Sequence, residues 1–302
     1  MLERIIVPLD GSLTAEKILP HVRRVLYRND SEVILVRAVI PPPVENSIMI
    51  AEAQLAAARE YVLGQQDRLE KAGVRVKHVV RIGSAIGVIL DVIEEEKATM
   101  VAMATHGTSG VARVVFGSVA EGVMRKSPIP VLLVRPFWSY ELVATGLTEH
   151  RPVRNLLLPV DGSDRSMEAL PGVIEFADLF ETRVVLLRVL EAKKRKSDGE
   201  NERAEAEKQL QAMARALGKK GVETLSLVES GDPVDQILKT VRFHEIDLIA
   251  MTTHGRTGLS RAVMGSVTEK VLRQATVPML VTRSLKPEAR KRTAGAAKAG
   301  KR

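Results

Sequence analysis

Two short segments, each present twice in the chain, combine residue types that can bind a nucleotide. The first is an Asp-Gly-Ser tripeptide, which begins at Asp10 and again at Asp161, two residues after Pro8 and Pro159. Its carboxylate could accept a hydrogen bond from a ribose hydroxyl or bind a phosphate-bound Mg²⁺ ion. The same tripeptide is equally typical of an Asx turn that caps a following helix. The tripeptide alone therefore leaves both interpretations open.

The second segment has two glycines with nine residues between them and ends in Gly-Ser. Its residues are Gly107, Gly117 and Ser118 in the first copy and Gly255, Gly265 and Ser266 in the second. Glycine lets the backbone approach an anion closely, and Gly-Ser at the start of a helix offers a hydroxyl and N–H groups that have no helical partner. Turn glycines followed by a serine cap would have the same sequence. The neighbouring Asp-Gly-Ser tripeptide favours phosphate binding.

A histidine precedes the first glycine of each of these segments. We interpret His106 and His254 as residues that orient the loop, because no second histidine or carboxylate lies at metal-ligand spacing from them. The chain lacks the G-x-x-x-x-G-K-[ST] motif of P-loop proteins, a G-x-G-x-x-G motif after a strand, and the G-x-S-x-G motif of hydrolases. These classes of nucleotide site and catalytic site are not expected.

Both segments belong to a repeat that covers most of the chain. Residues 4–12 (RIIVPLDGS) recur at 155–163 as NLLLPVDGS, and residues 105–135 recur at 253–283 without a gap and with about half of the positions identical. The repeat predicts a domain at 1–136, a linker at 137–152, a second domain at 153–284 and a basic tail at 285–302.

Strands and helices are predicted to alternate along each repeat. Short runs rich in β-branched residues, apolar on both faces, are typical of strands buried in a parallel sheet. In the first repeat these runs lie at 4–9, 33–38, 74–80, 99–103 and 131–134, and helical patterns lie at about 14–28, 45–72, 85–96 and 117–126. We therefore expect an α/β protein with two tandem doubly wound domains, each a five-stranded, mainly parallel sheet with helices on both faces (Rossmann-like). Ligands bind beyond the carboxyl ends of such strands, where both segments fall.

Composition and charge place further limits on function. The chain has no cysteine, which excludes disulfides and thiol catalysis and fits a cytoplasmic protein. No apolar run approaches the roughly 20 residues of a membrane span. The tail after Ser284 holds seven Lys or Arg residues and one Glu, so it carries most of the net charge of +8. We expect the tail to be disordered, and neither a membrane nor a nucleic acid is the expected main partner.

The repeats resemble the universal stress protein family over both predicted domains. ATP-binding members of that family carry the pattern G-x2-G-x9-G-[ST] and an acidic residue after the first strand. By this resemblance Asp10 and Asp161 take the acidic position, while Ala38 and Val189 take the position whose backbone meets the adenine. The resemblance also extends the fold class to the adenine nucleotide alpha hydrolase-like group.

The resemblance implies one nucleotide-binding set in each repeat. The first comprises Pro8, Asp10, Ala38, Met103, Ala104, His106, Gly107, Gly117, Ser118 and Val119. The second comprises Pro159, Asp161, Val189, Met251, Thr252, His254, Gly255, Gly265, Ser266 and Val267. Both repeats depart from the family pattern at its first glycine, which is replaced by Ala104 and by the bulkier Thr252.

The resemblance further implies that the chain binds ATP, with AMP or ADP as alternatives and Mg²⁺ as a companion ion. The expected role is a nucleotide-dependent stress or signalling module, with unidentified protein partners and at most slow ATP hydrolysis; no catalytic residue is assigned. The last strand of each repeat is expected to pair across a pseudo-twofold axis, so that the chain mimics a dimer and can dimerise further. An enzyme of the wider hydrolase-like superfamily and a scaffold that binds no nucleotide are the alternatives.

Overall fold

A computed structural model describes most of the chain and defines two repeats of the same topology. The described residues are 3–26, 31–41, 47–105, 117–135, 153–163, 170–190, 196–252 and 265–282. Repeat 1 comprises β1 (Arg4–Pro8), α1 (Leu13–Glu16), α2 (Leu19–Val25), β2 (Glu32–Val39), α3 (Ser47–Lys71), β3 (Arg75–Ile82), α4 (Ala85–Glu95), β4 (Met100–Ala104), α5 (Ser118–Lys126) and β5 (Val131–Val134). Repeat 2 comprises β6 (Asn155–Val160), α8 (Leu170–Phe180), β7 (Arg183–Leu190), α9 (Lys196–Gly218), β8 (Thr224–Ser230), α10 (Pro233–Phe243), β9 (Leu248–Thr252), α11 (Ser266–Gln274) and β10 (Met279–Thr282). The predicted linker and tail lie outside the described residues.

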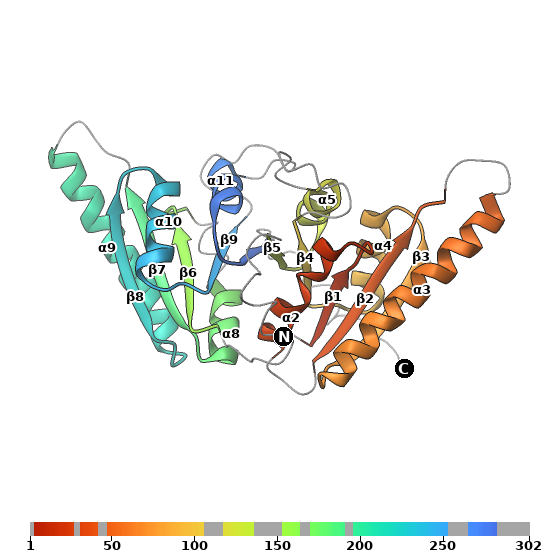
Figure 1. Ribbon diagram of the computed structural model, residues 1–302. Helices are drawn as coiled ribbons and strands as arrows, with labels where there is room; N and C mark the ends of the chain where they lie inside the picture. The colour runs from red at the N-terminus through yellow and green to blue at the C-terminus, as the bar shows by residue number, and fades with distance from the viewer. Residues whose placement is uncertain are drawn as a thin grey trace, which may run out of the picture.

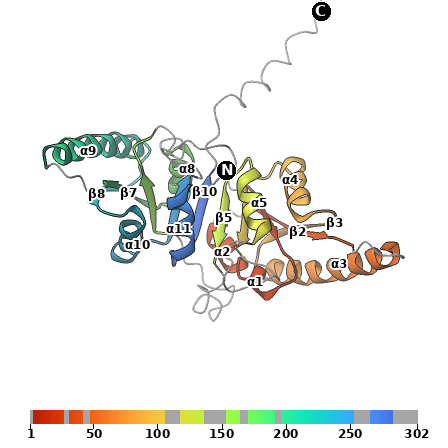
Figure 2. The ribbon, with the colours of Figure 1, turned by 90° about the horizontal axis from the view of Figure 1, so that it is seen from above.

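The strands of both repeats form one ten-stranded sheet. Its order is β3-β2-β1-β4-β5-β10-β9-β6-β7-β8, and neighbouring strands within each repeat are parallel. β10 runs antiparallel to β5, with Leu280 opposite Leu132, so the predicted pairing of the last strands is confirmed. This pairing places β5 and β10 at the centre of the molecule and the long helices α3 and α9 at its two ends (Figures 1 and 2).

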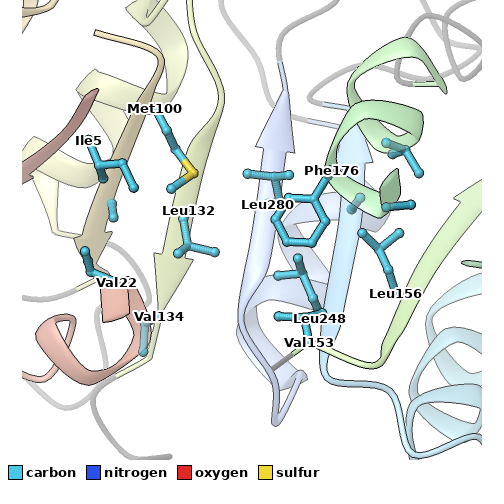
Figure 3. Close-up of a cluster of buried hydrophobic side chains, with 14 of the residues drawn as sticks. Ile5, Val22, Met100, Leu132, Val134, Val153, Leu156, Phe176, Leu248 and Leu280 are labelled. Atoms are coloured by element: carbon cyan, nitrogen blue, oxygen red, sulfur yellow. The ribbon is translucent and has the colours of Figure 1, made fainter. Parts of the chain in front are cut away.

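Helices cover both faces of the sheet, as the sequence predicts for a doubly wound fold. Buried side chains of α1, α2, α3, α8 and α9 pack on one face, and those of α4, α5, α10 and α11 pack on the other. On each face the buried cluster continues from one repeat into the next. Figure 3 shows one cluster on both sides of the β5–β10 pairing, with Met100 and Leu132 on the repeat 1 side and Phe176 and Leu280 on the repeat 2 side. The two repeats therefore share their core.

Helix caps fix the elements that lead to the site. Ser84 accepts a hydrogen bond from the Gly87 N–H and caps α4, and Asp232 accepts bonds from two N–H groups at the start of α10, which begins with Pro233. After α3 and α9, Gly73 and Gly221 adopt positive φ angles of +81° and +79°, which only glycine adopts without strain. The caps set where α4 and α10 begin, and the two glycines set where α3 and α9 end.

The single helix predicted at about 14–28 is wrong. The structure has two helices there, α1 and α2, separated by Lys17 and Ile18. Pro20 has no N–H to donate to the carbonyl of Glu16, and its ring would clash with that carbonyl in a continuous helix. The chain therefore ends α1 at Glu16 and starts a new helix at Leu19.

Candidate functional site

The Asp-Gly-Ser tripeptide forms an Asx turn directly after the first strand of each repeat. Asp10 Oδ1 accepts hydrogen bonds from the Ser12 N–H (3.0 Å) and hydroxyl (2.6 Å), and Ser12 Oγ in turn accepts one from the Ala15 N–H at the start of α1. In repeat 2, Asp161 Oδ1 accepts the corresponding bonds at 2.9 and 2.6 Å. The structural interpretation of the tripeptide is therefore correct, and it leaves open whether the carboxylate also meets a ligand.

The Gly-Ser pair begins the last helix of each repeat, α5 or α11, without a side-chain cap. Gly117 is the N-cap of α5, with φ −66° and ψ 140°, and no side chain accepts a hydrogen bond from the first turn. Its own N–H donates to the Thr105 carbonyl at 2.7 Å, which ties the helix start to the end of β4. Gly265 is the N-cap of α11, which likewise has no side-chain cap. Because the first-turn N–H groups lack a side-chain acceptor and the helix dipole favours negative charge there, an anion is the natural partner.

In repeat 1 these two features border one cavity of about 290 Å³. Its walls come from the ends of β1, β2 and β4 and from the starts of α4 and α5. Eight of the ten residues predicted for repeat 1 line it, namely Pro8, Asp10, Ala38, Met103, Ala104, Gly117, Ser118 and Val119. The other two, His106 and Gly107, lie outside the described residues.

The cavity also has walls that the sequence did not reveal. They are Leu9, Ala15, Val36, Arg37, Ala85, Ile89, Thr105 and Ala120. Most are small or apolar and belong to no motif. Of the described lining residues, Asp10 is the one acid and Arg37 the one base.

The guanidinium group of Arg37 supports the Asx turn. Its guanidinium donates to the Leu9 carbonyl at 3.4 Å and lies against Gly11, where an added Cβ would be 3.6 Å from Nη2. Arg188 of repeat 2 does the same, with 3.3 Å to the Val160 carbonyl. An arginine that follows an apolar run in the second strand, at the same place in both repeats, is the sequence feature that could have identified this pair.

The repeat 2 residues occupy equivalent positions in the fold. Pro159 lies in β6, and Asp161 directly follows that strand. Val189 lies in β7, and Met251 and Thr252 end β9. Gly265 is the N-cap of α11, which begins with Ser266 and Val267. His254 and Gly255 lie outside the described residues. A separate cavity of about 220 Å³ lies between the turn and α9, lined by Gly162, Arg188, Glu202, Glu205, Ala206 and Gln209. None of the predicted residues lines that cavity.

In repeat 1 a polar network lies between the turn and α3. The Tyr61 hydroxyl donates to Glu16 Oε1 at 3.1 Å, and Arg68 Nη1 donates to Glu16 Oε2 at 3.4 Å. Burial, and then the negative charge of Glu16, raise the pKa of the Tyr61 phenol above its usual range. The phenol is therefore held in its protonated, donating form.

Metal-binding clusters and membrane-spanning helices are two further features that a functional site can involve. Within the described ranges, no group of three or more His, Asp or Glu side chains is placed to hold a metal ion. No helix in that same part of the chain has the length and apolar character needed to span a membrane.

Comparison with known proteins identifies the family. The model of the universal stress protein family matches the chain twice, at residues 1–135 and 152–283. The chain belongs to the universal stress protein family. It is a tandem member, because each match covers one repeat.

Individual relatives match about one repeat. Universal stress protein MJ0531 of Methanocaldococcus jannaschii is 30% identical over 144 residues, which are 45% of this chain and 85% of the relative. Universal stress protein MJ0577 of the same organism is 29% identical over 153 residues, covering 43% of this chain and 94% of the relative.

Solved structures show the fold over both repeats. A universal stress protein from Archaeoglobus fulgidus DSM 4304 superposes with a TM-score of 0.73 at 20% identity, covering 94% of this chain and all of that one. A putative universal stress protein from Pseudomonas aeruginosa UCBPP-PA14 gives a TM-score of 0.64 at 16% identity, covering 93% of both chains. At these identities the likeness concerns the fold alone.

Proposed function

We propose that this universal stress protein binds ATP, or another adenine nucleotide, in the cavity of repeat 1. The observation that carries the proposal is that eight of the ten residues predicted for repeat 1, from four separate parts of the sequence, line one cavity at the carboxyl ends of the strands. Ligands of open α/β sheets bind at this edge.

Each part of the cavity suits one part of a nucleotide. The uncapped first turn of α5 offers N–H groups to phosphate oxygens. The Asp10 carboxylate uses Oδ1 in the turn and lines the cavity, where it would accept a hydrogen bond from a ribose hydroxyl. Val36, Ala38 and Ile89 supply an apolar wall of the kind on which a base packs.

The proposed role is nucleotide-dependent signalling rather than rapid turnover. Asp10 is the one acidic side chain among the described lining residues, and it is already bonded to Ser12. A residue held in this way is a poor general base for a water molecule, so hydrolysis is expected to be slow at most. Nucleotide occupancy would instead change how the chain meets its protein partners.

The test is to identify the nucleotide that purified protein carries. We expect heat denaturation of fresh protein to release adenine nucleotide, detected by chromatography and mass spectrometry, and the Gly117→Val variant to release little. The φ and ψ angles of Gly117 are ones that valine also adopts, so the loss would reflect bulk in the cavity. Gly64→Val is the matched control, because a Cβ at Gly64 in α3 would meet no atom within 4 Å.

A negative result would have a clear meaning. Protein that releases no nucleotide, and that excess Mg-ATP does not stabilise against heat, would contradict the proposal, since a ligand at about 100 times its Kd adds about 2.7 kcal/mol to the free energy of unfolding. The cavity would then belong to a scaffold that acts through protein partners alone.

A further inference from the structure

The first helix of repeat 1 links the turn that borders the cavity to the long helix α3. Asp10 Oδ1 accepts hydrogen bonds from Ser12, and Ser12 Oγ accepts one from the Ala15 N–H, so the turn and α1 form one hydrogen-bonded unit. α1 has only four residues and ends at Glu16. A single helical turn is not stable by itself. The position of this unit, and with it that of the Asp10 carboxylate, is therefore set by its contacts with the rest of the protein.

Glu16 supplies a polar contact between α1 and α3. The Tyr61 hydroxyl donates to Glu16 Oε1 at 3.1 Å, and the Arg68 guanidinium forms an ion pair with Glu16 Oε2 at 3.4 Å. The side chain of Glu16 is 17% exposed, and that of Arg68 is 57% exposed. Exposed ion pairs contribute little, whereas a hydrogen bond to a largely buried carboxylate is costly to lose. Of these two contacts, we therefore expect the one with Tyr61 to hold α1 more firmly.

The charge of Asp10 acts on the same phenol. Burial, and then the negative charges of Glu16 and Asp10, raise the pKa of Tyr61. The guanidinium of Arg37, which donates to the Leu9 carbonyl under the turn, opposes this shift. Tyr61 therefore lies within electrostatic reach of the carboxylate that we assign to the ribose.

Tyr61 approaches the turn from the face of the sheet opposite to the cavity. It packs against the buried cluster on the α3 face, which includes Leu35 and Val62. The cavity residues Val36 and Ile89 belong to the cluster on the α4 face. Among the described residues that line the cavity, none comes from α3. The turn is thus the route by which Tyr61 can influence a bound nucleotide.

Repeat 2 has different residues at the equivalent positions. The residues that replace Glu16, Tyr61 and Arg68 there are Met167, Gln209 and Ala216. A methionine has no carboxylate and an alanine has no charge, so this set of side chains cannot form the same network. The carboxylate-centred link between the turn and the long helix is therefore a property of repeat 1.

We infer that Tyr61 and Arg68 of α3, acting through Glu16, position the Asp10 turn for the nucleotide of repeat 1. This inference rests on the proposed function and adds two positioning residues to it, since neither side chain lines the cavity. Coupling of this kind is reciprocal. An α3 that is held by Tyr61 favours binding, and a bound nucleotide holds α3 more firmly.

The experiment compares the affinity for Mg-ATP of chains that differ at this contact. Calorimetric titrations are made after removal of carried nucleotide and in a Gly265→Val background, so that binding in repeat 2 does not contribute. Tyr61→Phe should raise the Kd about two- to tenfold, the range that one hydrogen bond produces. Leu63→Ala is the matched control, because this exposed residue lies on the same helix and its loss should leave the Kd unchanged.

Two variants of Glu16 keep the test independent of Tyr61. Glu16→Ala removes both contacts with α3 and should weaken binding at least as much as Tyr61→Phe. Glu16→Gln keeps an oxygen that can accept the Tyr61 hydroxyl, so it should restore most of the affinity that alanine loses. Thermal unfolding without ligand shows whether each variant folds.

Hydrogen exchange supplies a readout that a merely structural role would not move. In the Gly265→Val chain, saturating Mg-ATP should slow amide exchange around Tyr61 and Arg68, by a factor similar to the change in Kd that Tyr61→Phe causes. The same addition to the chain that also carries Tyr61→Phe should have little effect on exchange in α3.

The outcomes separate the inference from the proposed function. Binding that neither Tyr61→Phe nor Glu16→Ala weakens, or exchange in α3 that does not change with Mg-ATP, would overturn the inference and leave the proposed function standing. A loss of stability without a change in Kd would have the same meaning, because Tyr61 would then support the fold alone. No binding at any Mg-ATP concentration would overturn the proposed function and the inference with it.

Discussion

The two repeats hold the same backbone features and surround them with different side chains. The Asx turn has nearly the same hydrogen-bond lengths in both, and both turns rest on an arginine of the second strand. The residues around these features vary in size and polarity. The comparison teaches that the turn and the helix start recur with the fold, whereas the side chains around them are free to differ between the repeats.

The space between the turn and the long helix differs as well. In repeat 1 Tyr61 and Glu16 meet there. Gln209 occupies the position equivalent to Tyr61, and repeat 2 has a cavity at that place, into which Glu202 and Glu205 face alongside Arg188. Arg188 therefore lines the same cavity as two carboxylates, whereas Arg37 interacts electrostatically with the Tyr61 phenol.

The largest expected effect concerns the core that the repeats share. Leu132 and Leu280 are paired across the β5–β10 junction and are both buried. Replacing either with alanine should lower the free energy of unfolding by about 2–5 kcal/mol. Because the cluster is continuous, denaturant unfolding followed by circular dichroism should show one transition for each variant.

Independent repeats would behave differently. Each variant would then give two transitions, only one of which is shifted. Leu63→Ala is the control, because this leucine of α3 is 49% exposed and its loss should change little.

The next effect tests whether the two turns are equally tight. Gly11 and Gly162 have φ angles of +83° and +81°, so alanine at either position should cost about 1–2 kcal/mol of backbone strain. Gly162→Ala should cost more, because its Cβ would lie 2.9 Å from Nη2 of Arg188, which is itself buried. Urea unfolding measures both losses. Equal losses would mean that Arg188 moves aside at no cost.

The smallest effect concerns the Tyr61–Glu16 network of repeat 1. Tyr61→Phe removes the hydrogen bond to Glu16 and should cost about 0.5–1.5 kcal/mol near neutral pH. Since the folded-state pKa of Tyr61 is raised, the phenol stabilises the fold below its unfolded pKa of about 10, and this stabilisation is lost as the pH rises further.

The difference in unfolding free energy between the unaltered chain and Tyr61→Phe should therefore narrow between pH 7 and about pH 11. Urea titrations at the two pH values measure it. A difference that is constant or widens would show that the phenol is not held protonated. Gln209→Ala, at the equivalent position of repeat 2, should show no such pH dependence.

Much of the fold could be predicted because its residues carry local information. Apolar β-branched runs identified every strand of repeat 1 to within two residues. The break between α1 and α2 was missed although Pro20 is visible in the sequence, because the helical pattern continues on both sides of it.

The candidate site was predictable only in part. Asp10, Gly117 and Ser118 combine polar or conformational properties that point to a ligand from the sequence alone. Ala85, Ala120 and the other small wall residues have no such property, because an alanine that leaves space is indistinguishable in sequence from one that packs tightly. Arg37 was not predicted, because a charged residue within one strand is informative only when it recurs at the same place in the other repeat, as it does in Arg188.

The antiparallel pairing of β5 with β10 has a consequence for how the two halves can evolve. Because both strands belong to one polypeptide, their association is intramolecular, with an effective concentration that does not fall when the protein is diluted. A symmetric assembly of two identical chains would acquire any substitution in both halves at once. In this chain a change such as Ala to Thr at the end of the fourth strand affects one half only, so the two halves can diverge independently while their pairing is kept.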